Sequence, residues 1–297
     1  MQNHSSEDRN ALAKRASLLH LSSIKLAEGM RSGSFKSLYY GRGIEFSGVR
    51  EYLRGDDVRS IDWNVTARMG KPFVKIFDEE RELNVFLIVD ESSSMTTGSG
   101  KKSRLETAIE CAFLLTLASE QNTSPVGAVL FDGAIHFSSA PKAGQNQSLL
   151  LLKNLTKKQT VTVNGSALDN ALQGALKLLK KRTLVLVISD FRTSLWEKPF
   201  GQLCGKHDVV AIRITDSSDD ELPEIGSIPF CDLETNYTQV IPTSSVQLRL
   251  AWREDNIKRV AVWKKECLKY GGIPLTISTD SDVAFELTNF FNSRERR

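Results

Sequence analysis

The stretch "NVFLIVDESSSM", residues 84–95, joins a short apolar run to an acid and a group of serines. A short, continuous apolar run is typical of a strand that is buried on both faces of a parallel sheet. Asp90 closes the run, and Ser92 and Ser94 follow it at alternate positions. Because side chains alternate along an extended chain, an extended turn would point both serines to the same side as the acid.

Further apolar runs alternate with helical patterns through most of the chain, which indicates crossover connections between parallel strands. The sequence therefore predicts an α/β fold, a doubly wound and mostly parallel sheet with helices on both faces. A hairpin is expected at Asp132-Gly133, which is a strong turn pair. The other expected strands are 183–189, 208–214 and 274–278, and the expected helices are 104–119, 146–155, 166–181, 197–205, 246–270 and a closing helix that ends at Phe291.

The N-terminal part of the chain has a different pattern. Residues 7–28 carry apolar side chains at helical spacing, which predicts an amphipathic helix. Residues 31–75 are rich in glycines, aromatics and short alternations, with too few apolar residues for a core of their own. We therefore expect an extension over 1–82 that packs on a domain at 83–297, with an insertion at about 216–245 where the strand–helix rhythm breaks.

Composition limits the classes of function. The chain has 297 residues and a formal net charge of +3, without a basic block that interleaves aromatics, so nucleic acid is not a favoured partner. The four cysteines lie far apart and form no Cys-x-x-Cys pair, which favours reduced thiols in a reducing compartment. The N-terminus has no apolar signal-peptide core, and the apolar runs are far short of the roughly 20 residues of a membrane helix. We expect a cytoplasmic protein that does not itself span a membrane.

Two acids are expected at neighbouring ligand positions. Ligands of an open α/β sheet collect at the carboxyl ends of its strands, and both Asp90 and Asp190 close apolar runs. Two carboxylates there repel each other unless a cation or hydrogen-bond donors lie between them. Ser166, in "NGSALDNAL", would bring a third hydroxyl to the same crevice. A ligand set of oxygens alone favours Mg²⁺ or Mn²⁺ over zinc. The alternative is that the serines only cap a helix.

Three segments resemble the loops of the metal-ion-dependent adhesion site of von Willebrand factor A-type domains: "DESSSM", "NGSALDNAL" and "LVLVISDF". The upstream stretch at 41–80 resembles the signature of a bacterial family catalogued as domain of unknown function fifty-eight. The resemblance covers roughly residues 30–297. The matching signature positions are Glu45, Phe46, Arg50, Tyr52, Gly55, Asp56, Asp57, Arg59, Ile61, Asp62, Trp63, Ala67 and Arg68.

The resemblance implies a von Willebrand A-type fold and a non-enzymatic adaptor that works with a MoxR-type AAA+ ATPase. It also implies a metal site whose open position takes a carboxylate of the partner. Ser166 stands where the family has Thr, and Ala167 stands where an Asp often follows, so we expect weakened binding. The implied ligands are Asp90, Ser92, Ser94, Ser166 and Asp190.

Other interpretations stay open at this point. The same acids could serve a metal-dependent phosphohydrolase, although Ser92 stands where that chemistry usually has a second acid. The site could also be vestigial in a purely structural subunit. The charged signature could dock a partner, or its arginines (Arg50, Arg59 and Arg68) could pair with Asp56, Asp57 and Asp62 while Trp63 anchors the segment in a core.

Overall fold

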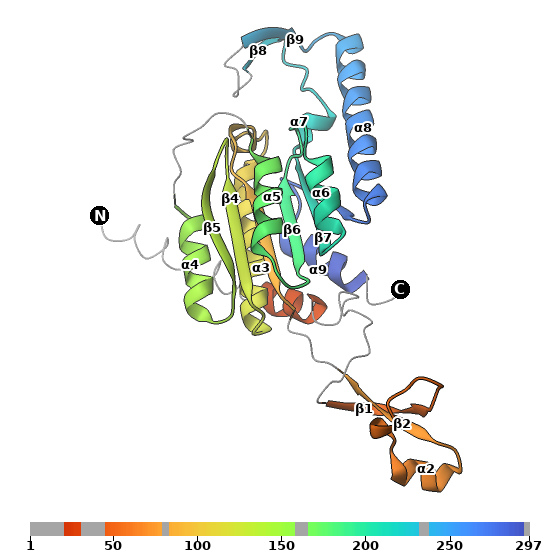
Figure 1. Cartoon of the computed structure of the whole chain (residues 1–297). Helices are drawn as coiled ribbons and strands as arrows, with labels where there is room; N and C mark the ends of the chain where they lie inside the picture. Colours follow the sequence, from red (N-terminus) through yellow and green to blue (C-terminus); the bar gives the residue numbers. More distant parts are fainter. Residues whose placement is uncertain (1–20, 31–44, 79–82, 158–165, 232–237, 294–297) are drawn as a thin grey trace. The chain divides into compact units, whose positions relative to one another are not determined.

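The computed structural model describes residues 21–30, 45–78, 83–157, 166–231 and 238–293 (Figure 1). The chain forms two compact units, one from residues 1–35 and 83–297 and the other from residues 36–82. A helix over 21–30 contributes Leu26 and Met30 to the core of the large unit, whereas the sequence grouped it with the rest of the extension. The first part of that expected helix, residues 7–20, lies outside the described residues.

The large unit is built on a sheet of six strands in the order β10-β7-β6-β3-β4-β5. All neighbours are parallel except β5, which runs antiparallel to β4 at one edge of the sheet. The expected parallel sheet and the hairpin at Asp132 are therefore confirmed. The bounds are β3 (Val85–Asp90), β4 (Val126–Phe131), β5 (Ile135–Lys142), β6 (Leu184–Ser189), β7 (Asp208–Thr215) and β10 (Ile273–Ser278).

Helices cover both faces of this sheet (Figure 1). Side chains alternate along a strand, so Leu87 and Val89 of β3 enter one core while Phe86 and Ile88 enter the other. The first core is closed by α3, α4 and α9, and the second by α5, α6 and α8. The helices are α3 (Arg104–Gln121), α4 (Gln145–Leu155), α5 (Leu168–Leu178), α6 (Glu197–Cys204), α8 (Val246–Lys269) and α9 (Val283–Ser293).

The predicted insertion contains a short helix and a small antiparallel pair. These are α7 (Ser217–Asp220), β8 (Ser227–Cys231) and β9 (Thr238–Pro242), and they connect β7 to α8. In Figure 1 the β8–β9 pair lies beyond the end of the main sheet, next to the start of α8. The break in the strand–helix rhythm thus marks a real departure from the alternating pattern.

The small unit pairs β1 (Glu45–Glu51) with β2 (Phe73–Asp78) and holds η1 (Val58–Ser60) and α2 (Trp63–Met69). Arg50 donates two hydrogen bonds to Asp56, at 2.7 and 2.8 Å, which is one of the three arginine–aspartate pairs that the structural interpretation expected; the ion pair of Asp62 is with Lys75, at 3.9 Å. The Arg50 contact, with the backbone N–H of Leu53, lowers the pKa of Asp56 to about 2. Asp57 and Asp62 cap η1 and α2 by accepting backbone N–H groups.

The expectation for Trp63 was wrong. Trp63 opens the first turn of α2, directly after the capping Asp62, and is 68% exposed, so it is not buried in a core within the small unit. Among the described residues of this unit, Val74 is the buried apolar side chain. Leu53, Val58 and Met69 are exposed as well, whereas Phe73 and Ile76 are partly buried.

Two further sequence expectations concern membranes and cysteines. Within the described ranges, the structure has no helix that combines the length and the apolar character needed to cross a membrane. Cys111, Cys204 and Cys267 are free thiols, and burial raises the pKa of each of them. The side chain of Cys231 lies outside the described residues.

Candidate functional site

Two acids meet where neighbouring strands end. β3 and β6 are paired in parallel, with Asp90 as the last residue of β3 and Asp190 directly after β6. Both side chains are buried, with Asp90 1% and Asp190 4% exposed. The carboxyl-end geometry predicted from the two apolar runs is thus present in the structure.

The first loop, which connects β3 to α3, places the hydroxyls of Ser92 and Ser94 close to Asp90. One carboxylate oxygen of Asp90, Oδ1, accepts the backbone N–H of Ser92 at 3.0 Å. The hydroxyls of Ser92 and Ser94 lie 3.2 Å apart. Ser92 precedes the 3-10 helix η2 (Ser93–Thr96), yet in this described loop its side chain makes no capping hydrogen bond. The capping interpretation therefore fails for Ser92.

The second loop also reaches Asp90. The Ser166 hydroxyl donates to Asp90 Oδ2 at 3.4 Å. The next residue, Ala167, donates its backbone N–H to the carbonyl oxygen of Asp132 at 2.7 Å, which ties the loop to the end of β4. Ser166 is thus placed where the pattern predicted, with a long contact to the acid.

The hydroxyl of Ser189, which the sequence interpretation missed, makes the shortest hydroxyl contact with Asp90. Ser189 donates to Asp90 Oδ2 at 2.6 Å and accepts the backbone N–H of Phe191 at 3.0 Å. Ser189 is the last residue of β6, so its position one residue before Asp190 was the available signal. It connects the ends of the first and third loops.

Of the carboxylate oxygens of Asp90 and Asp190, one oxygen of Asp190 accepts no hydrogen bond from the described residues. Its Oδ1 accepts the backbone N–H of Arg192 at 3.1 Å. Its Oδ2 is buried and has no hydrogen-bond partner among the described residues, and the Nε of Arg192 lies 3.9 Å away. Most buried polar atoms in proteins have a hydrogen-bond partner, so this oxygen is a candidate ligand position. The Oε2 of the neighbouring Glu91 is likewise buried without a hydrogen bond among the described residues.

The electrostatics of the pair favour a cation. Burial raises the pKa of Asp90, and the nearby charge of Asp190 raises it further, against hydrogen bonds from Ser189 and Ser92. Two buried carboxylates and neutral hydroxyls form an all-oxygen donor set, which fits a hard divalent cation. Among the described residues, no group of three or more His, Cys, Asp or Glu side chains could hold a metal ion. A cation at this place would therefore have to take serine hydroxyls as well as the two carboxylates.

A second ionisable pair lies next to this site. The buried Glu91 points its Oε2 at the Nε2 of His136, 3.1 Å away, at the start of β5. Burial, with the charges of Asp132 and Asp90, raises the pKa of Glu91 to about 7. Burial also lowers the pKa of His136. The sequence interpretation assigned His136 a surface or core role and did not connect it with Glu91.

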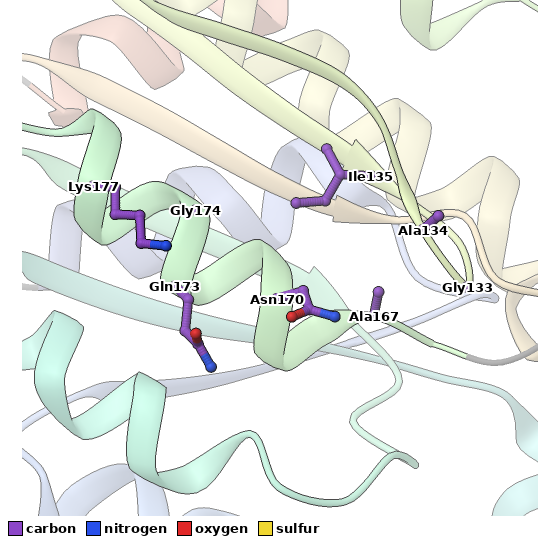
Figure 2. A pocket seen from close by; sticks show the side chains of 8 residues that line it. All are labelled: Gly133, Ala134, Ile135, Ala167, Asn170, Gln173, Gly174 and Lys177. Carbon is purple, nitrogen blue, oxygen red and sulfur yellow. The ribbon is translucent and has the colours of Figure 1, made fainter.

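A groove of about 450 Å³ begins beside the second loop. Figure 2 shows Asn170, Gln173 and Lys177 along α5, opposite the turn between β4 and β5. The walls are close at Gly174, where a Cβ would lie 3.6 Å from the Cδ1 of Ile135. The lining residues are Gly133, Ala134, Ile135, Ala167, Asn170, Gln173, Gly174 and Lys177.

Comparison with known proteins gives one family and several relatives. The sequence profile of a family described as "Protein of unknown function DUF58" matches residues 48–261. An uncharacterized protein of Mycobacterium tuberculosis is 29% identical over 295 residues, which cover 97% of this chain and 92% of the relative.

Two solved structures match part of the chain at low sequence identity. The conserved hypothetical protein BatB from Bacteroides thetaiotaomicron has a TM-score of 0.45 and 17% identity, covering 72% of this chain and 100% of that one. An aerotolerance-related membrane protein from Bacteroides fragilis has a TM-score of 0.48 and 18% identity, covering 72% of this chain and 98% of that one.

Proposed function

We propose, given that the chain belongs to the family described as "Protein of unknown function DUF58", that it is a non-enzymatic protein-interaction module with a metal-dependent adhesion site. The observation that carries the proposal is the buried Oδ2 of Asp190, which accepts no hydrogen bond from the described part of the chain and lies beside a second buried acid. A structural role alone gives no reason to bury two carboxylates at adjacent strand ends.

The proposed cation is Mg²⁺, with Mn²⁺ as the close substitute. Its ligands would be Asp90, Ser92, Ser94, Ser166 and Asp190. When bound, the cation supplies a positive charge and an open coordination position for a carboxylate of a partner protein. The residues of this chain hold the two acids in place, orient the three hydroxyls and keep the carboxylates out of bulk water.

The groove beside Ser166 would take the residues that flank the partner's acid. Asn170 and Gln173 present amide groups, which can both donate to and accept from a peptide backbone. Lys177 adds a positive charge farther along α5 and would favour a second acid in the partner. The proposed partner is a MoxR-type AAA+ ATPase, which rests on the family resemblance, and the proposed location is the cytoplasm.

Calorimetric titration of the full chain with Mg²⁺ and Mn²⁺ tests the metal site. We expect one site in the natural sequence and none in Asp90→Ala. The matched control is Asp255→Ala, which removes an acid of α8 whose side chain is 68% exposed and should leave binding unchanged. Absence of binding at millimolar metal in the natural sequence would overturn the proposal.

A second experiment separates an adhesion site from an enzyme. Pull-down of the purified, nucleotide-free ATPase should require Mg²⁺, be lost in Asp90→Ala and survive in Asp255→Ala. Release of p-nitrophenol from p-nitrophenyl phosphate that depends on Asp90 would instead support the phosphohydrolase.

A further inference from the structure

Arg192 lies between two acids in the third loop. Its Nε is 3.9 Å from Asp190 Oδ2, while a terminal nitrogen of its guanidinium contacts Asp219 Oδ1 directly. A guanidinium keeps its charge at all ordinary pH values, so it can pair with either carboxylate. The short contact shows which acid holds it in this structure: Asp219.

Asp219 is fixed from several directions. It is 2% exposed and belongs to α7, directly after β7. The same oxygen that contacts Arg192 also receives the guanidinium of Arg104, the first residue of α3. Its other oxygen, Oδ2, accepts the backbone N–H of Asp216 at 3.1 Å. The carboxylate therefore has little freedom to follow Arg192 toward another partner.

The same short helix also holds the first loop. Asp216, which caps α7, accepts the hydroxyl of Ser99 at 2.6 Å and its backbone N–H at 3.0 Å. Arg104 in turn donates to the Thr97 hydroxyl. Ser99 and Thr97 follow the serines of the candidate site, so α7 is a common anchor for the first and third loops.

We propose that Asp219 is a positioning residue that holds the Arg192 guanidinium short of hydrogen-bond contact with Asp190, with its Nε 3.9 Å from Oδ2, and so keeps Asp190 Oδ2 open for the cation. The inference rests on the proposed metal site and concerns how its affinity is set. Without the charge of Asp219, Asp190 remains the acid within ion-pair distance of Arg192. The guanidinium then closes on Oδ2, occupies it and repels the incoming divalent cation.

The test is a double-mutant cycle measured by Mg²⁺ calorimetry on the full chain. Asp219→Asn should weaken Mg²⁺ binding by roughly tenfold, a coupling of ordinary size for charges in contact. Arg192→Gln removes the competing charge and should bind Mg²⁺ as tightly as the natural sequence or more tightly. The double variant should bind like Arg192→Gln, because Asp219 has no competitor left to restrain.

Each other outcome has a distinct meaning. Unchanged affinity in Asp219→Asn, or equal weakness in the single and double variants, would overturn the inference, since a merely structural role of Asp219 is not rescued by Arg192→Gln. If Asp219→Asn fails to fold because Arg104 loses its partner, Arg192→Gln alone decides, and weaker binding there overturns the inference. Absence of Mg²⁺ binding in the natural sequence overturns the proposed function itself, and this inference with it.

Discussion

Aspartates lie both in the small unit and at the strand ends of the large unit, but their burial and their hydrogen bonding differ in opposite directions. Asp56 lies at the surface with a complete set of donors from Arg50 and Leu53, and its pKa falls to about 2. Asp90 and Asp190 are buried, the pKa of Asp90 is raised, and one oxygen of Asp190 has no hydrogen-bond donor within the described ranges. Acids with complete partners stabilise the fold, whereas a buried pair of acids with incomplete partners is a candidate ligand position.

The largest expected effect concerns Asp90. Replacing it with Asn, which keeps its size, should abolish detectable Mg²⁺ binding because the remaining acid cannot hold the cation alone. Without metal, the free energy of unfolding should change by no more than about 1 kcal/mol, since the buried charge was itself unfavourable. Calorimetry and urea unfolding measure the two quantities. A large loss of metal-free stability would place Asp90 with the structural acids.

Asp216 is a buried acid with a complete set of donors and provides the opposite case. Burial alone would raise its pKa, but hydrogen bonds from Ser218 and Ser99 outweigh burial and lower the pKa. Asp216→Asn should therefore cost about 2–3 kcal/mol at pH 7. An acid with a lowered pKa stabilises the fold above its unfolded pKa, roughly 4, and this contribution is lost as the pH falls below that value. Urea unfolding at pH 7 and pH 3 should show the difference shrink, and an equal cost at both would contradict the assignment.

Glu91 should show the reverse pH dependence. Burial raises its pKa to about 7, so in the folded chain Glu91 stays protonated up to about pH 7. In the unfolded chain it loses its proton near pH 4.5. Metal-free stability should fall as the pH rises from 4.5 to 7, and Glu91→Gln should remove this loss, on the order of 2 kcal/mol. Unfolding curves of both proteins over that range provide the check. Parallel curves would mean that His136 or water offsets the burial.

The smallest effect is expected at the surface pair of the small unit. Arg50→Gln removes both hydrogen bonds to Asp56, and exposed ion pairs contribute little to stability. We expect faster amide hydrogen exchange at Leu53, whose N–H donates to Asp56, and only a slight change in the thermal midpoint. A large drop in the midpoint would show that this pair is as essential as the buried acids.

The fold was predictable because its strands are buried on both faces. Every residue of β3, β4 and β6 is buried, and such strands produce the continuous apolar runs seen in the sequence. Trp63 was expected to anchor the charged segment in a core, whereas it opens the capped helix α2 and is exposed within the small unit. Periodicity describes elements and does not report which face of a short helix meets a core.

The candidate site was predictable only in part, because some of its contacts join residues that lie far apart in the sequence. Asp90 and Asp190 close apolar runs, and this can be read directly from the sequence. Ser189 is the last residue of such a run and has no distinguishing pattern of its own. Its contact with Asp90 follows from the parallel pairing of β3 and β6. Asp219 lies in the acid-rich segment "DSSDD", residues 216–220, and its contacts with Arg104 and Arg192 join positions 115 and 27 residues away. Contacts of that separation leave no local pattern.

The edge strand β5 also affects how molecules meet one another. Its pairing with β4 shifts register at two places, and it ends on Pro141 and Lys142. Proline has no N–H to offer a new strand, bulged strands twist away from a flat edge, and a terminal lysine disfavours close approach of a second sheet. We therefore expect β5 to be a poor template for strand exchange between molecules, so that concentrated samples should resist fibrillar aggregation through this edge.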